Sequence, residues 1–114
     1  MTTTYTVHRA DDSCAIEGQG LTAREAAEMI LGHNGRAYDM RLDNGFWCIF
    51  VANARGRMVP GWANGHPLQS LAATETAAWA EIAPEILYHN WRGGHLEAVT
   101  DAEYADLCPG ECED

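Results

Sequence analysis

The residues most suggestive of chemistry are two cysteines near the C-terminal end of the chain. Cys108 and Cys112 lie four residues apart, and His89 and His95 are the histidines nearest to them. A tetrahedral zinc site would need two such further ligands. Because the spacing is not that of a standard zinc knuckle, we expect exposed tail cysteines, no metal and no cofactor. A zinc site and a disulfide between the two thiols stay as alternatives.

The densest polar cluster is residues 88–95, which could supply a general acid or base. A helix cap and a packed tryptophan explain the same residues without catalysis. The tail cysteines lie among carboxylates, which disfavour the thiolate that a nucleophile needs, and Cys14 and Cys48 alternate with apolar neighbours as core residues do. No serine-hydrolase elbow, phosphate-binding loop, dinucleotide fingerprint or zinc-protease motif is present. We therefore predict no catalytic residues and no enzymatic activity.

A second candidate site is a stretch without acidic residues, which contains Arg55, Arg57, Trp62 and His66. Two arginines neutralise few phosphates and the net charge of the chain is −10, so this stretch does not predict nucleic-acid binding. Arginine and tryptophan are frequent anchors of protein interfaces. One hypothesis is therefore a regulatory module that docks on a partner through the segment from Arg55 to His66. A solvated connector is the structural alternative.

Acidic residues are the strongest functional signal. The chain has 17 acids against 7 bases, all of them arginine, and the last 18 residues hold seven acids and no base. This charge excludes attraction to nucleic acid or to an anionic membrane, and it favours a partner with a basic nucleic-acid-binding surface. Plain solubility is the alternative. The predicted acidic face comprises Glu97, Asp101, Glu103 and Asp106, extended by Glu75, Glu81 and Glu85.

Two hairpins are expected among the elements that position these residues. Residues 5–9 and 14–17 alternate on either side of a polar turn. The pair Asn44-Gly45 is typical of a type I′ turn, which would place Leu42 opposite Trp47 and continue with Met40 opposite Ile49 and Tyr38 opposite Val51. We expect a helix to cover the apolar face formed by these six residues.

Three helices are expected. Thr22 and Glu25 form a capping box before an apolar stripe of Ala23, Ala26, Ala27, Ile30 and Leu31. Thr74 begins a second helix, with a stripe from Trp79 to Leu87 and a kink or restart at Pro84. Thr100 and Glu103 begin a short acidic helix that runs towards Leu107. Residues 53–67 are predicted to form a loop, with a short strand around residues 68–72.

These elements predict an α+β protein with an antiparallel sheet of four to five strands. Two main helices pack on one face of the sheet, and a short acidic helix follows near the C-terminus. We expect a single domain over residues 1–107, an acidic tail over residues 108–114, and a monomer or weak homodimer. The N-terminus lacks the basic and apolar regions of a signal peptide, and no apolar run approaches about 18 residues. We therefore expect no membrane association and a cytoplasmic location.

The overall pattern resembles a known group of proteins. The matching features are residues 20–27 (GLTAREAA), 34–38 (NGRAY) and 100–104 (TDAEY), with a tryptophan-bearing strand between the second and third. The pattern resembles small acidic proteins of phages and mobile elements in alphaproteobacteria, a group that includes anti-CRISPR proteins. The resemblance implies a non-enzymatic inhibitor that binds a CRISPR effector, with the type I Cascade complex as the expected one, and blocks target DNA.

Overall fold

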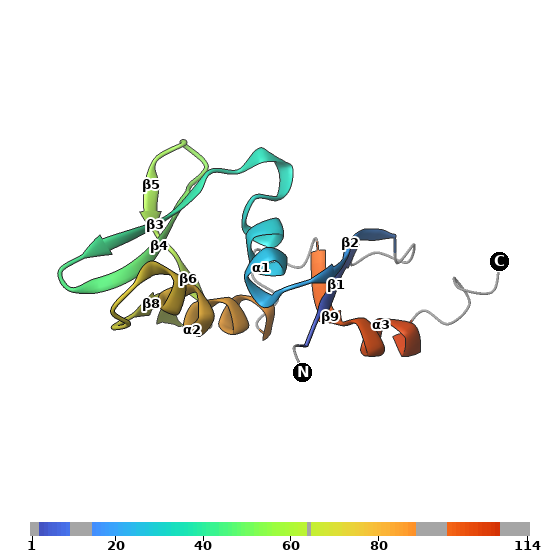
Figure 1. Cartoon of the computed structure of the whole chain (residues 1–114). Coiled ribbons are helices and arrows are strands. Elements are labelled where there is room, and N and C mark those ends of the chain that lie inside the picture. The colour runs from blue at the N-terminus through green and yellow to red at the C-terminus, as the bar shows by residue number, and fades with distance from the viewer. Residues whose placement is uncertain (1–2, 10–14, 64, 89–95, 108–114) are drawn as a thin grey trace.

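The computed structural model describes residues 3–9, 15–63, 65–88 and 96–107 of the chain (Figure 1). In chain order, the elements are β1 (Tyr5–Arg9), β2 (Ile16–Leu21), α1 (Ala23–Leu31), a 3-10 turn (His33–Gly35), β3 (Tyr38–Asp43), β4 (Phe46–Ala52), β5 (Met58–Pro60), β6 (Trp62–Ala63), β7 (His66–Pro67), β8 (Gln69–Ser70), α2 (Glu75–Tyr88), β9 (Leu96–Thr100) and α3 (Asp101–Leu107). The predicted α+β class and the short acidic helix near the C-terminus are confirmed.

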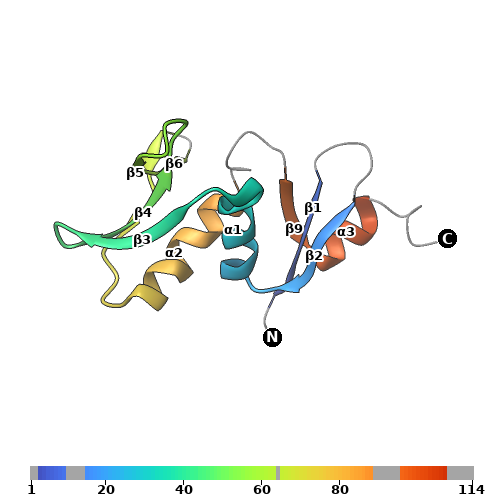
Figure 2. The ribbon, with the colours of Figure 1, turned by 90° about the horizontal axis from the view of Figure 1, so that it is seen from above.

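The strands form two larger antiparallel sheets, where the sequence predicted one. The first sheet has the order β2-β1-β9, and the second has the order β3-β4-β5 with β8 also paired to β4. A two-stranded ribbon of β6 and β7 follows the second sheet. Figures 1 and 2 show α1 between the two sheets, α2 running along the second sheet towards α1, and α3 against the first sheet at the opposite end of the molecule from the β3–β4 hairpin. The two main helices therefore pack against both sheets.

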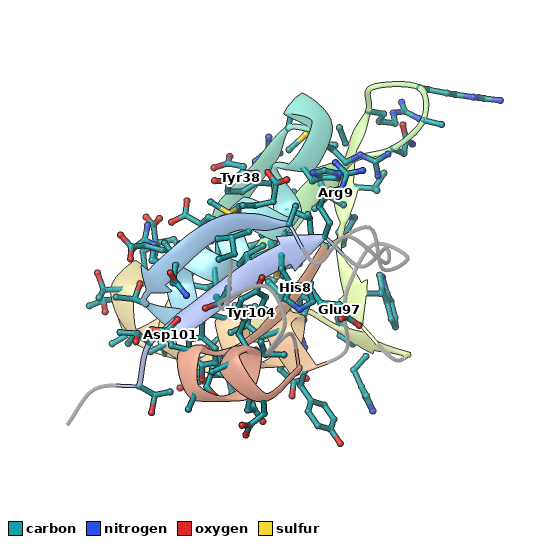
Figure 3. All side chains as sticks on the ribbon, turned by 90° about the vertical axis from the view of Figure 1, so that its right-hand side faces the viewer. His8, Arg9, Tyr38, Glu97, Asp101 and Tyr104 are labelled. Carbon is teal, nitrogen blue, oxygen red and sulfur yellow. The ribbon has the colours of Figure 1, made fainter. Side chains whose placement is uncertain are left out.

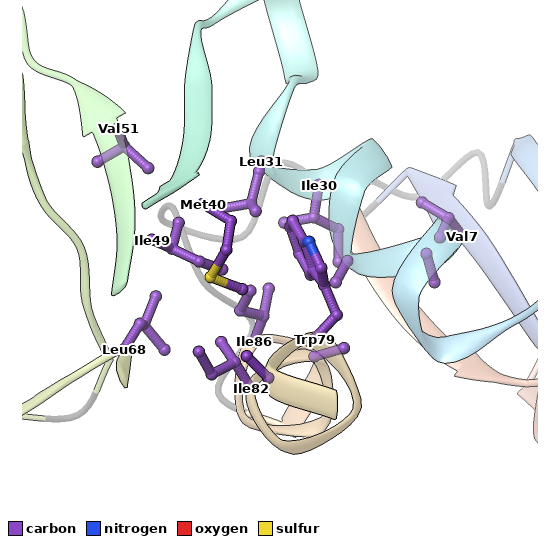
Figure 4. Packing of buried hydrophobic residues seen from close by; sticks show 14 of the residues in the cluster. Val7, Ile30, Leu31, Met40, Ile49, Val51, Leu68, Trp79, Ile82 and Ile86 are labelled. Atoms are coloured by element: carbon purple, nitrogen blue, oxygen red, sulfur yellow. The ribbon is translucent and has the colours of Figure 1, made fainter. Parts of the chain in front are cut away.

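The core lies between the helices and the sheets (Figure 4). Helix α1 contributes Ile30 and Leu31, and α2 contributes Trp79, Ile82 and Ile86, all with at most 2% of their surface exposed. The predicted stripes are confirmed in their centres, whereas Ala23 and Leu87 at their ends are only partly buried. From the sheets, the main buried contributors are Val7, Met40, Ile49 and Val51, and Leu68 adds to them from between β7 and β8.

The β3–β4 hairpin has the predicted register. Leu42 lies opposite Trp47, Met40 opposite Ile49, and Tyr38 opposite Val51. The turn residues Asn44 and Gly45 have φ angles of 53° and 84°, as a type I′ turn requires.

The expectation that a helix covers this whole face is wrong at the tip of the hairpin. Leu42 is 62% exposed, whereas Met40 and Ile49 are buried. The hairpin extends beyond the helices (Figure 1), so Leu42 near its tip is exposed, whereas Trp47 opposite is partly buried against the core.

The prediction of a loop over residues 53–67 is also wrong, because this segment holds three short strands. Val59 of β5 pairs with Val51 of β4, and the Gly61 amide donates to the Ile49 carbonyl at 2.8 Å. Strands of two or three residues, interrupted by glycine and proline, are too short to leave a periodic signal. Strand β9 was not predicted either, although it pairs along its whole length with β1.

The predicted helix starts are all present. Thr22 and Glu25 form the expected capping box, and the Thr74 hydroxyl accepts from the Ala77 amide at 3.2 Å. Helix α2 continues through Pro84 without restarting. Among the helices of the described residues, none has the length and apolarity needed to cross a bilayer.

Candidate partner-binding surface

The seven predicted acidic residues lie on three consecutive elements of the chain. Glu75, Glu81 and Glu85 belong to α2, Glu97 belongs to β9, and the remaining three belong to α3. The sequences of these three elements contain neither arginine nor lysine. These three elements therefore carry carboxylates and no base of their own.

Asp101 holds α3 against the first sheet. Its carboxylate accepts hydrogen bonds from the hydroxyls of Thr4 and Thr6, the latter at 2.6 Å, and from the Gly20 amide at 3.4 Å. The threonine hydrogen bonds lower the pKa of Asp101 below its ordinary value, because they stabilise the charged form. Asp101 is thus both a negative charge and an attachment point between strands distant in the sequence.

Glu103 and Glu81 also have structural partners. Glu103 accepts from the Thr100 amide at 2.9 Å, while the Glu103 amide donates to the Thr100 hydroxyl at 3.1 Å, so the predicted capping box is present. Glu81 accepts from the buried Ser70 hydroxyl at 2.7 Å. Each bond occupies only one of the several acceptor positions of a carboxylate, so both groups retain capacity for a partner.

Glu75 lies at the start of α2, near α1. It accepts from the indole N–H of Trp79 at 3.4 Å, and one of its oxygens is 3.8 Å from the guanidinium of Arg24. This arginine also pairs with Glu28 and lies over the Trp79 ring at 4.9 Å from its centroid. Glu75 is therefore partly neutralised by a base of a neighbouring helix.

Glu85 and Asp106 are exposed, and neither side chain forms a hydrogen bond or ion pair with another residue of the described ranges. Of the seven carboxylates of the predicted acidic face, these two have no partner within the described residues. Substituting them should leave the fold intact.

A hollow of about 500 Å³ lies between the C-terminal half of α2 and the junction of β9 with α3. Its apolar lining comes mainly from Pro84, Leu87 and Tyr88 of α2 and from residues 98–99 of β9. Glu85 and Glu103 also line it, together with Tyr5 and Thr100. The sequence did not predict this groove, because it arises from the packing of elements rather than from a local motif.

A buried histidine lies under α3 on the same sheet (Figure 3). His8 is 3% exposed, its Nδ1 is 2.8 Å from the Arg9 carbonyl oxygen, and its ring lies 5.3 Å from the Tyr104 ring. Its Nε2 is 3.6 Å from Glu97 and makes no hydrogen bond within the described part of the chain. Sequence reasoning missed His8 and Tyr104, since a single histidine in an alternating strand gives no signal.

The residues of the alternative docking site lie on a β-ribbon rather than on a loop. Trp62 of β6 pairs with Pro67 of β7 and is 57% exposed, and His66 lies beside it on β7. Arg55 and Arg57 are exposed in a separate turn. The backbone amides of both arginines donate to the side-chain oxygen of Asn53. The ribbon pairs His66 with Ala63, so strand alternation turns the His66 side chain to the face opposite that of Trp62, and both arginines lie in the turn that precedes β5.

The cysteine predictions are only partly covered by the described residues. The expectation that Cys48 is a core residue is wrong, because it is only half-buried and lies outside the core cluster; burial together with the charge of Asp43 raises the pKa of its thiol. Cys14, both tail cysteines and residues 89–95 lie outside the described ranges. Within those ranges, no group of three or more histidine, cysteine or acidic side chains could hold a metal ion.

The chain matches no protein-family model, and the comparisons with curated proteins and with solved structures found no match.

Proposed function

We propose that this protein is a non-enzymatic inhibitor of the anti-CRISPR type that occupies a basic nucleic-acid channel of a CRISPR effector. The type I Cascade complex is the expected target, and the inhibited step is the binding of target DNA. The observation that supports this proposal is the charge of α2, β9 and α3, which carry the seven predicted carboxylates, called the acidic surface below, and no arginine or lysine of their own.

The rigidity of the carboxylates supports a role in recognition rather than in solubility alone. Asp101, Glu103 and Glu81 are fixed by hydrogen bonds to hydroxyls or amides of the protein. Fixed charges lose little side-chain entropy on binding, so they give more affinity per charge than mobile ones. DNA itself presents about one negative charge per 1.7 Å of helix axis, and a channel built for it attracts any comparable array.

Binding of this kind is steered by long-range attraction and falls with salt. The test is the affinity of the purified protein for purified type I Cascade, measured by interferometry at low and at physiological salt. The double variant Glu85→Lys and Asp106→Lys changes two charges that have no structural partners in the described ranges. We expect at least a tenfold loss of affinity, and a smaller salt dependence than that of the unmodified protein.

A matched control reverses the same number of charges elsewhere. Glu17 of β2 and Asp43 of β3 are also exposed and lie outside the acidic surface. The double variant Glu17→Lys and Asp43→Lys should bind Cascade with an affinity within about threefold of that of the unmodified protein. A change in net charge away from the interface alters the association rate only modestly. Equal losses in both double variants would contradict a role for the acidic surface.

A second candidate function rests on the exposure of Trp62. An exposed tryptophan on a short ribbon is a typical anchor for a protein partner, so a regulatory module docking through the segment from Arg55 to His66 is the alternative. Under this alternative, Trp62→Ala abolishes binding to the partner while the reversal of Glu85 and Asp106 is harmless. The inhibitor proposal expects the opposite pattern.

A further inference from the structure

Strand β9 is the edge of the first sheet. It pairs with β1 on one side, and no other strand of the described residues pairs with its second side. The Asp101 amide donates to the Thr4 carbonyl, so the alternation of an antiparallel ladder turns the Val99 and Glu97 backbone groups towards β1. The N–H and C=O of Ala98 consequently point to the open edge.

This open edge borders the groove described above. Ala98, Val99 and Thr100 line one wall of the groove, and Leu87 and Tyr88 of α2 line the other. An exposed sheet edge beside an apolar groove is the arrangement by which proteins bind extended peptides, with main-chain bonds to the edge and alternate side chains in pockets. The hollow of about 500 Å³ has room for one or two apolar side chains.

The charge of the groove identifies the kind of peptide that fits. Glu85 and Glu103 both line it, and α2, β9 and α3 carry no arginine or lysine. Glu103 uses one carboxylate oxygen for the Thr100 amide and keeps the other for a partner. A peptide with an apolar residue flanked by lysine or arginine would match this groove, because the apolar residue fits the apolar lining and the bases fit the two carboxylates.

We propose that the β9 edge binds an extended, basic-apolar segment of the partner protein by strand addition. The Ala98 backbone forms the ladder, Leu87 and Tyr88 contact the apolar side chain, and Glu85 and Glu103 pair with the flanking bases. This inference rests on the proposed function, since it names the part of the acidic surface that contacts the basic partner. It also requires that the partner expose an extended segment.

The test uses the full chain and two synthetic peptides, followed by two-dimensional ¹⁵N NMR. The basic probe is acetyl-Lys-Leu-Lys-Val-Lys-amide, and the acidic control replaces each lysine with glutamate. We expect a saturable shift of the Ala98 amide and slower hydrogen exchange there with the basic peptide alone. Methylation of the leucine amide in the probe removes a donor, and it should weaken binding at least fivefold if that amide pairs with the edge. Undiminished binding of the methylated peptide would contradict the ladder.

Variants separate the groove from general charge. Glu85→Lys should lower the affinity of the basic peptide at least tenfold, whereas Asp43→Lys makes the same charge change on the distant hairpin and should leave it unchanged. Equal effects of both variants, no saturable shift, or an equal response to the acidic peptide would overturn the inference. Because no effector is used, binding to Cascade without a peptide response removes only this inference. A peptide response without binding to Cascade removes only the proposed function.

Discussion

The imidazole of His8 faces the carboxylate of Glu97 across neighbouring strands, with 3.6 Å between Nε2 and Oε1. A carbonyl oxygen only accepts hydrogen bonds, so the contact of Nδ1 with the Arg9 carbonyl places a hydrogen on Nδ1. In the neutral ring, the lone pair of Nε2 then faces a carboxylate. A carboxylate cannot donate a hydrogen bond, so Nε2 has no hydrogen-bond partner within the described residues.

Substitutions of Glu97 test this relationship. Glu97→Gln supplies an amide that can donate to Nε2, so we expect the free energy of unfolding to rise by about 1 kcal/mol. Glu97→Leu has a similar size but no donor, and Nε2 lacks a hydrogen-bond partner in this variant as it does in the described part of the unmodified protein, so we expect a change within about 0.5 kcal/mol. Chemical denaturation measures both. Equal stability of the two variants would show that Nε2 does not depend on residue 97.

Asp101 should make the protein sensitive to acid. Its pKa is lowered in the folded state, so the stability it contributes is present at neutral pH and is lost as the pH falls through that lowered value. Asp101→Asn should cost about 1–2 kcal/mol at pH 7, because charge-assisted hydrogen bonds with Thr4 and Thr6 become neutral ones. The variant should also lose less stability between pH 5 and pH 2. Urea titrations at several pH values provide the measurement. If the free energy of unfolding falls equally with pH in the variant and in the unmodified protein, Asp101 is not the source of the acid sensitivity.

Tyr38 should make the protein sensitive to alkali. Burial and the hydrogen bond that its hydroxyl donates to Glu28 at 2.8 Å raise its pKa to about 12. An unfolded tyrosine ionises near pH 10, so the contribution of Tyr38 is complete below that pH and is lost as the pH rises towards 12. Tyr38→Phe should cost about 1 kcal/mol at pH 7 and remove this alkaline loss. Absorbance at 295 nm should show one fewer late-ionising tyrosine in the variant.

The turn of the β3–β4 hairpin depends on residues that tolerate positive φ. Gly45 has a φ of 84°, and nothing lies within 4 Å of the position a β-carbon would take. Gly45→Ala should therefore destabilise the protein by about 1 kcal/mol through backbone strain alone. Gly45→Asn, which tolerates this conformation better, should recover part of the loss. Thermal unfolding distinguishes the two variants, and equal melting temperatures would argue against strain.

The sequence predicted local structure where a short motif determines it. Asn44-Gly45 set the register of the hairpin, and the capping boxes at Thr22 and Thr100 marked two helix starts. Strand β9, which was not predicted, has no such motif, since its five residues lack polar-apolar alternation. Its position follows from pairing with β1, which is far away in the chain. Division of the strands into two sheets was unpredictable for the same reason.

The candidate site was predicted as a list of charges and not as a geometry. The acids of α2, β9 and α3 were identified from composition, but the partners of Asp101 are threonines near the N-terminus. The groove beside Leu87 depends on how α2 packs against β9, and no local pattern encodes that contact. Charge patterns therefore predict which segments carry a surface, and tertiary packing determines which of their carboxylates are fixed.

The most direct test of the central claim is competition between this protein and target DNA for purified type I Cascade. A labelled DNA target is titrated into the effector with and without a saturating amount of the protein, at low and physiological salt. The proposed function predicts mutually exclusive binding that weakens as salt rises, and loss of competition in the variant with Glu85→Lys and Asp106→Lys. Simultaneous binding of the protein and DNA to the effector, or no binding of the protein at low salt, would contradict it.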